Sequence, residues 1–228
     1  MTTAENLSQP VTTAIEDYLK TVYLMGRERG PVKTVSLAER MNVKPSSVTA
    51  MIKTLAEMKL VEHEPYYGIR LTPRGELIAL EVIRHHRLIE LYLVEALGFT
   101  WDEVHEEAEV LEHVISEKLE ARIAAYLGDP ARDPHGDPIP ALDGSLPDEP
   151  DGAAPTLADL PVKARARVLR VCDQHAERLR YLAELGLLPG ARVQVTAQAP
   201  FGGPVSVRVG KAVHALDRRL AREILVES

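Results

Sequence analysis

The sequence has only one cysteine and no long apolar run. Cys172 cannot form a disulfide within the chain, which favours a reducing compartment. Residues 1–20 are polar and acidic, and they lack the apolar core of a signal peptide. Nowhere do about 18 apolar residues follow one another without interruption, so we predict no transmembrane helix and no membrane partner. Together these absences favour a cytoplasmic protein.

The chain also lacks an overall excess of basic residues, because its formal net charge is −7. The charges are distributed unevenly, however. Residues 1–75 contain 10 Lys and Arg against 8 Asp and Glu, whereas residues 76–127 contain 4 against 12. A slightly basic first segment can contact nucleic-acid phosphates, and an acidic middle segment can attract cations. The negative total therefore does not exclude DNA binding.

Residues 12–72 have the pattern of a winged helix-turn-helix. A helix with an apolar face is followed by a short helix, for which Ser36 and Glu39 are predicted to form a capping box. Ser46 or Ser47 is predicted to cap the third helix, and two short strands joined by a tight turn follow. This order of elements is typical of a DNA-binding fold.

The rest of the chain is predicted to form long helices and a small β-barrel. Residues 73–127 are expected to be helical, with one break at residues 98–100 and Thr100 as the cap of the second helix. Residues 129–161 are rich in Pro, Gly and Asp and are expected to form a loop and linker. Residues 163–188 are expected to form a helix. An SH3-like barrel is then predicted from strands and a closing helical turn at residues 193–196, 205–209, 212–214 and 217–223.

The sharpest chemical signal is a set of histidines and acids in the predicted middle helices. One helix face carries His105, Glu109, Glu112 and His113. Their offsets place them within a sector of roughly 100°. His86 and Glu90, spaced i,i+4, form a second pair on the preceding helix. Because His105 and His113 are about 12 Å apart along the helix axis, we predict two metal sites.

Oxygen and nitrogen ligands without sulfur suit Mn²⁺, Fe²⁺ or Co²⁺, and Zn²⁺ also binds such sets. The alternative is a solvated acidic helix with histidines at its edges. Six such residues at ligand spacing on adjacent helices favour metal binding.

Polar residues at the start of the third predicted helix are the second signal. Small polar side chains there suit contacts with bases and phosphates at the entrance of a major groove. The predicted DNA contacts of this helix and of the wing are Lys44, Ser46, Ser47, Thr49, Lys53, Tyr66 and Arg70. The alternative is an ordinary three-helix packing unit with polar caps.

Six segments carry a recognisable pattern across nearly the whole chain. They are DYLKTVY, SLAERMNVKPSSVTAMIKTLAEMKLV, LTPRGELIALEVIRHHRLIE, VHEEAEVLEHVISEKLEARI, HGDPIP and LAELGLLPG. Together they resemble the diphtheria-toxin-repressor and manganese-transport-regulator family of metal-dependent transcriptional regulators.

This resemblance implies two metal sites. The ligands implied for the site near the DNA-binding domain are Asp17, Glu109, Glu112 and His113. Those implied for the second site are His86, Glu90 and His105, with a further ligand from the C-terminal domain. His175 is the best match for that further ligand, and Asp173 and Glu177 stay open.

The manganese branch of the family is similar to this chain in having acids at the positions of Asp17 and Glu109. This implies Mn²⁺ as the cofactor, with Fe²⁺ possible and Co²⁺, Zn²⁺ or Cd²⁺ as substitutes in vitro. Compact two-metal manganese sensors have an acid where this chain has Lys20. The resemblance therefore implies two separated sites rather than a bridged pair.

The function implied by the resemblance is that of a metal-dependent regulator, not an enzyme, which represses metal-uptake genes by binding palindromic double-stranded operator DNA. The apolar residues between Glu81 and Tyr126 exceed what one short helix pair can bury, which favours a homodimer. The alternatives are a metalloenzyme or a metal-buffering protein that uses the same His and carboxylate side chains.

The predicted fold class is mainly α with a small β content. We expect a winged helix-turn-helix DNA-binding domain at residues 1–74 and a helical metal-binding and dimerisation domain at residues 75–143. A linker at residues 144–160 is expected to lead to an SH3-like (FeoA-like) β-barrel at residues 161–228.

Overall fold

The computed structural model describes residues 10–64, 66–147 and 154–227. By their internal contacts the residues form two compact units, the first made of residues 1–84 and 140–145 and the second of residues 85–139 and 146–228. The finer division into three domains stays a prediction. None of the helices in the described ranges has the length and apolar character needed to cross a membrane.

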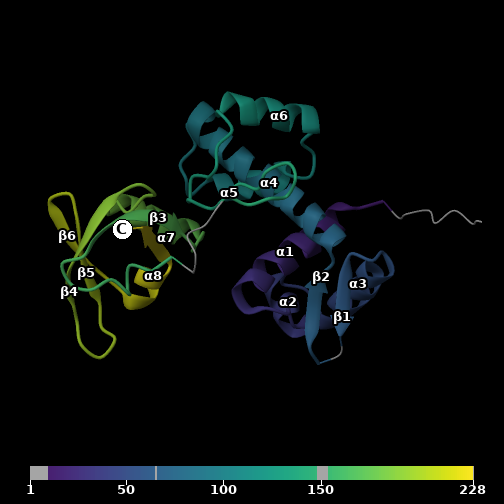
Figure 1. Ribbon diagram of the computed structural model, residues 1–228, viewed down its shortest axis with the longest axis horizontal. Helices are drawn as coiled ribbons and strands as arrows, with labels where there is room; N and C mark the ends of the chain where they lie inside the picture. Colours follow the sequence, from purple (N-terminus) through teal and green to yellow (C-terminus); the bar gives the residue numbers. More distant parts are fainter. Residues whose placement is uncertain (1–9, 65, 148–153, 228) are drawn as a thin grey trace, which may run out of the picture. The chain divides into compact units, whose positions relative to one another are not determined.

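The first unit contains three helices, a β-hairpin and the first part of the long helix that begins at Pro73 (Figure 1). The bounds of the three helices and of the two hairpin strands are α1 Thr13–Arg29, α2 Thr34–Arg40, α3 Pro45–Glu57, β1 Val61–Glu64 and β2 Gly68–Leu71. The two strands pair antiparallel, with His63 opposite Ile69. The predicted apolar face of α3 is buried, since Val48, Ile52 and Leu55 all lie in the core. This arrangement confirms the predicted winged helix-turn-helix.

The predicted helix caps of this unit are wrong. Ser36 lies inside α2, which begins at Thr34. Ser46 and Ser47 lie inside α3, because Pro45 takes the first helical position. Proline suits that position because its φ is already helical and its missing N–H would have no intrahelical partner. The hydroxyls of Ser46 and Ser47 therefore do not cap α3.

The middle segment contains three helices, of which the first is confirmed as predicted, while the second predicted helix is divided in two. They are α4 Pro73–Leu97, α5 Val104–Leu111 and α6 Glu117–Tyr126. The continuous helix predicted after residue 100 is interrupted, because the Ser116 hydroxyl accepts a hydrogen bond from the Leu119 backbone N–H and starts α6. The Thr100 backbone N–H donates to Oε2 of Glu103 at 3.1 Å, which is one half of the predicted capping box, but α5 begins only at Val104, so Thr100 is not its cap.

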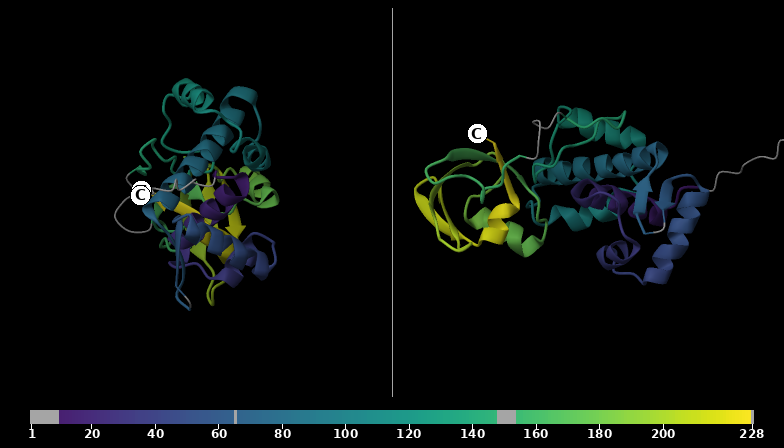
Figure 2. Two further views of the ribbon diagram at one scale, coloured as in Figure 1. Left: turned by 90° about the vertical axis from the view of Figure 1, so that its right-hand side faces the viewer. Right: turned by 60° about the horizontal axis from the view of Figure 1, so that its bottom comes forward.

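α5 and α6 pack on the part of α4 that belongs to the second unit (Figure 2). Ile89 and Leu93 of α4 share a buried cluster with Ala108 of α5. Leu88 of α4 lies in another cluster with Ile123 of α6. Packing against both α5 and α6 therefore fixes the position of this part of α4 and of the side chains that it carries.

A five-stranded antiparallel sheet in the order β6-β5-β4-β3-β7 forms the C-terminal barrel. Its elements are β3 Arg165–Val171, α7 Ala176–Glu184, β4 Arg192–Gln198, β5 Val205–Val209, β6 Ala212–Leu216, α8 Arg218–Arg222 and β7 Ile224–Glu227. The helix predicted for residues 163–188 is wrong in its first part. The segment RARVLRV mostly alternates exposed and buried side chains, which is the period of a strand. The predicted closing turn is confirmed as α8, capped by Asp217.

The helical part of the second unit is joined to the barrel through a buried loop. Trp101 lies in the core of the barrel. The Val171 backbone N–H donates to the carbonyl of His135, at 2.9 Å. Gly136 lies against the backbone of β3, since a Cβ added there would be 2.1 Å from the Leu169 carbonyl oxygen. The loop around His135 is therefore held between the helices and the barrel.

Candidate metal centre and DNA-binding surface

His86 of α4 is the centre of a cluster of imidazoles and carboxylates. Its Nδ1 atom lies 2.5 Å from Oε2 of Glu112, and its Nε2 atom lies 3.0 Å from Oε1 of Glu90. Nδ1 of His105 lies 3.1 Å from the same Nε2 atom. His86, Glu90 and Glu112 are buried, whereas His105 is partly exposed. Each ring nitrogen of His86 therefore faces one carboxylate.

Glu109 and His113 extend this cluster on either side. Oε1 of Glu109 lies 3.8 Å from Nε2 of His105 and 4.0 Å from Nδ1 of His86. Nε2 of His113 lies 3.3 Å from Oε1 of Glu112. His86, His105 and Glu109 offer ligand atoms within 4.8 Å of one another, which could hold a metal ion. Thus α4, α5 and the turn after α5 bring six predicted ligands into one network.

A second group of ligand atoms is fully buried, and two of its three residues, Asp133 and His135, were not predicted from the sequence. Glu90, Asp133 and His135 offer atoms within 4.8 Å of one another. Nδ1 of His135 lies 3.5 Å from Oε2 of Glu90. The other nitrogen, Nε2, bonds to the carbonyl of Trp101 at 2.7 Å, and the two rings are stacked at 5.6 Å. The signal in the sequence was a histidine between two aspartates in the loop after the helices, at residues 133–137.

The protonation of this buried group follows from its surroundings. Burial raises the pKa of Asp133 to about 8, and the neighbouring carboxylates of Asp137 and Glu90 act in the same direction. Burial alone would lower the pKa of His135, but its interaction with the Glu90 carboxylate, whose Oε2 lies 3.5 Å from Nδ1, raises it to about 9. Burial opposes ionisation of Glu90, yet the charge of His86, the hydrogen bonds from His86 and His105, and the nearby His135 imidazole hold its pKa well below the usual range.

Ligand atoms without hydrogen bonds show that this group fits a cation. Among the described residues, no hydrogen bond is made by Oε2 of Glu90, Oδ2 of Asp133 or Nδ1 of His135. Buried polar atoms in native proteins nearly always have a partner. A divalent cation held by these three side chains would satisfy all three atoms. Since metal ligands must be deprotonated, binding would displace the protons of Asp133 and His135.

The two remaining predicted ligands are His175 and Asp17. His175 immediately precedes α7 and is exposed, with Nδ1 at 2.8 Å from Oδ1 of Asp173. Within the described residues, no group of three potential ligands includes His175. Asp17 lies on α1 in the first unit. The ligand roles of Asp17 and His175 stay predictions.

The predicted DNA contacts of α3 lie on its exposed side. Lys44, Ser46, Ser47, Thr49 and Lys53 are all exposed. The Thr49 hydroxyl donates to the carbonyl of Pro45, at 3.0 Å. Nζ of Lys53 lies 4.0 Å from Oε1 of Glu57 while the side chain stays 80% exposed, so the ammonium can exchange this weak pair for a phosphate.

The wing presents two further predicted contacts. Tyr66 is fully exposed beyond the end of β1, with a positive φ of 71°. Arg70 is exposed on β2 and lies opposite Glu62 in the hairpin. An aromatic ring and a guanidinium on one hairpin are suited to contacts with a nucleic-acid backbone.

Three family models match the chain in order. Residues 10–69 match the N-terminal DNA-binding domain of iron-dependent repressors, and residues 72–141 match their metal-binding and dimerisation domain. Residues 156–228 match the FeoA domain.

Individual proteins are similar over almost the full length. The iron-dependent repressor IdeR of Mycobacterium tuberculosis is 32% identical over 93% of this chain and 96% of its own. The diphtheria toxin repressor of Corynebacterium glutamicum is 31% identical over 93% and 95%. A manganese-dependent transcriptional repressor solved in complex with manganese has 42% identity and a TM-score of 0.85, covering 94% of this chain and 99% of that chain. ScaR with bound Cd²⁺ has 34% identity and a TM-score of 0.79, with coverages of 94% and 99%.

Proposed function

We propose, starting from the fact that this chain belongs to the diphtheria-toxin-repressor and manganese-transport-regulator family, that Mn²⁺ or Fe²⁺ switches on its binding to operator DNA. As a member of this family the chain is a metal-dependent DNA-binding transcriptional repressor and not an enzyme. The predicted SH3-like barrel corresponds to the matched FeoA domain. The genes that we propose for repression are those of metal uptake.

The observation that most supports metal control is the network around His86. Its buried carboxylates and imidazoles continue into ligand atoms that lack hydrogen bonds. The first proposed site consists of Asp17, Glu109, Glu112 and His113. The second consists of His86, Glu90 and His105, completed by a C-terminal residue for which His175, Asp173 and Glu177 are the candidates.

The proposed cofactor is Mn²⁺, with Fe²⁺ able to replace it. Carboxylate and imidazole ligands without sulfur do little to reject Mn²⁺. By the Irving–Williams order Co²⁺, Zn²⁺ and also Cd²⁺ are expected to bind in vitro. Related proteins support both choices, since IdeR is named as iron-dependent and the repressor of 42% identity was solved with manganese.

The proposed DNA-binding form is a homodimer on a palindromic operator in the cytoplasm. An exposed apolar surface on and beside α5 and α6 supports self-association. Its members are Val110, Leu111, Val114, Leu119 and Tyr126. A twofold dimer presents two recognition helices to two half-sites, which suits a palindrome.

Replacing Asp17 by Ala tests the proposed switch. Mn²⁺ is expected to tighten operator binding of the wild type by about 5–150-fold, the usual range of a coupling energy between two sites. Asp17→Ala is expected to lose most of this gain because α1 no longer responds to the ion. The measurement is affinity for a promoter fragment from its own genome at controlled free Mn²⁺. Glu39→Ala, an exposed acid of α2, is the matched control and is expected to respond as the wild type does.

If Asp17→Ala responds to Mn²⁺ as strongly as the control, the first helix is not part of the switch. If the wild type shows no metal-dependent shift on any fragment, metal control itself is contradicted.

Replacing Lys53 by Gln tests the recognition helix. If Lys53 contacts a phosphate, the variant is expected to bind all sequences more weakly. The negative slope of log affinity against log salt concentration is expected to become shallower by about 0.9. Changes at Ser47 or Thr49 are expected to act more on sequence preference. The exposed Lys118 on α6 provides a matched control, Lys118→Gln. Equal slopes for the two lysine variants would remove Lys53 from the interface.

A further inference from the structure

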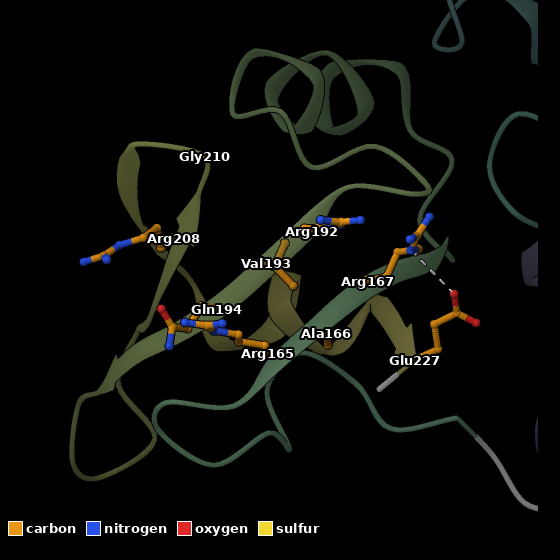
Figure 3. Close-up of a pocket in the computed structure, with 9 residues that line it drawn as sticks. All are labelled: Arg165, Ala166, Arg167, Arg192, Val193, Gln194, Arg208, Gly210 and Glu227. Atoms are coloured by element: carbon orange, nitrogen blue, oxygen red, sulfur yellow. Dashed lines mark ion pairs between the residues drawn. The ribbon is translucent and has the colours of Figure 1, made fainter.

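Four arginines gather on one outer face of the C-terminal barrel (Figure 3). They are Arg165, Arg167, Arg192 and Arg208, and all are exposed. They surround an open hollow of about 690 Å³ and come from three neighbouring strands, β3, β4 and β5. We call this surface the arginine face.

Strand register explains why these side chains share a face. Gln194 of β4 pairs with Arg165 of β3 on one side and with Arg208 of β5 on the other. Arg192 lies opposite Arg167, which in turn lies opposite Glu227. Since residues paired across a sheet point to the same side, the arginines form two adjacent rows.

The positive charge of the arginine face is not neutralised within the described structure. Glu227 is the one carboxylate among its described lining residues, and its Oε1 lies 3.9 Å from Nε of Arg167. Arg165, Arg192 and Arg208 have no ion-pair partner among the residues described. Like charges directly opposite each other, as at Arg167 and Arg192, destabilise a sheet. An arrangement that costs stability in a chain of net charge −7 points to an anionic partner.

We infer that the arginine face binds the phosphate backbone of duplex DNA beside the operator. A guanidinium presents a planar fork of donors that matches phosphate oxygens, which a lysine ammonium does not. Four such groups on an open surface can contact successive phosphates. This inference rests on the DNA binding described above, and it adds a second DNA contact surface outside the winged helix-turn-helix.

The residues that line the arginine face favour duplex DNA over single-stranded nucleic acid and over peptides. The described lining has no aromatic side chain, although single-stranded nucleic acid and proline-rich peptides are both bound on aromatic rings. Its apolar members, Ala166 and Val193, are buried in the floor and cannot anchor an acidic peptide. A chain that is already bound to DNA also meets neighbouring phosphates at high effective concentration.

The test compares salt dependence of operator binding for full-length protein with Mn²⁺. In the double variant Arg165→Gln/Arg208→Gln the negative slope of log affinity against log salt is expected to become shallower by about 1.8, or about 0.9 for each lost phosphate contact. Arg165→Lys/Arg208→Lys keeps both charges and is expected to keep most of the slope. Arg219→Gln/Arg222→Gln removes two exposed charges of α8 and is expected to keep the wild-type slope.

The inference would be overturned if Arg165→Gln/Arg208→Gln had the same salt slope as Arg219→Gln/Arg222→Gln. It would also be overturned if the wild type bound a duplex trimmed to the bare operator with the same salt slope as a longer duplex. Neither result would touch metal control, because that depends on the response of the wild type to Mn²⁺. Thermal unfolding of each variant confirms that the barrel is intact.

Discussion

His86→Ala is expected to lower the affinity for Mn²⁺ by more than about 100-fold and to abolish metal-dependent operator binding. Removing a side chain that only supports a metal ligand already costs about 10–100-fold. His86 does more than that, because its two nitrogens face the carboxylates of Glu112 and Glu90 within 3.0 Å. Its loss also takes one of several partners away from each of these two buried carboxylates.

The measurement is calorimetric titration with Mn²⁺, together with operator binding. His86→Gln is a second variant, since it fills the space and offers an amide but no basic nitrogen. It is expected to stay folded and still to lose metal affinity. His63→Ala changes an exposed histidine of β1 and serves as the control. Mn²⁺ affinity of His86→Gln equal to that of the control would contradict a ligand role for His86.

Gly136→Ala is expected to destabilise the second unit by about 2–5 kcal/mol, the sum of backbone strain and overpacking. An added Cβ would lie 2.1 Å from the Leu169 carbonyl oxygen, and neither backbone can move aside without breaking the sheet. The φ of 89° adds strain for any L side chain. The loop that carries His135 would then no longer pack closely against the backbone of β3.

The free energy of unfolding, measured with urea, decides this prediction. Gly98→Ala is the matched control, because Gly98 also has a positive φ, of 75°, but an added Cβ there meets nothing within 4 Å. Its loss is expected to be only about 1–2 kcal/mol. Equal losses for the two variants would show that the close approach to β3 is unimportant.

Local periodicity was enough to predict much of the fold and the six His and Glu side chains that lie together around His86. The apolar stripe of α3 and the i,i+4 pair His86–Glu90 are properties of single helices. Helical offsets also placed Glu109 and His105 on one face, and both lie in α5. The six predicted ligands therefore converge because two helices with correct faces pack against each other.

Long-range contacts explain what the sequence could not predict. Asp133 and His135 become candidate ligands only because their loop folds back on Glu90 of α4. The segment RARVLRV is a strand because β4 and β7 flank it, although its composition also suits a helix. Likewise, the arginine face joins residues that are up to 43 positions apart, and only the strand register brings them together.

Because Trp101 stacks on His135, its fluorescence can report on the state of that imidazole. Trp101 is the only tryptophan in the sequence, it is buried, and its ring lies 5.6 Å from the imidazole. Indole emission is sensitive to charge and to paramagnetic ions at such short range. Protonation or metal ligation of His135 therefore changes the fluorescence of one known residue, without any label. Occupancy of the buried group can be followed separately from DNA binding in the unmodified protein.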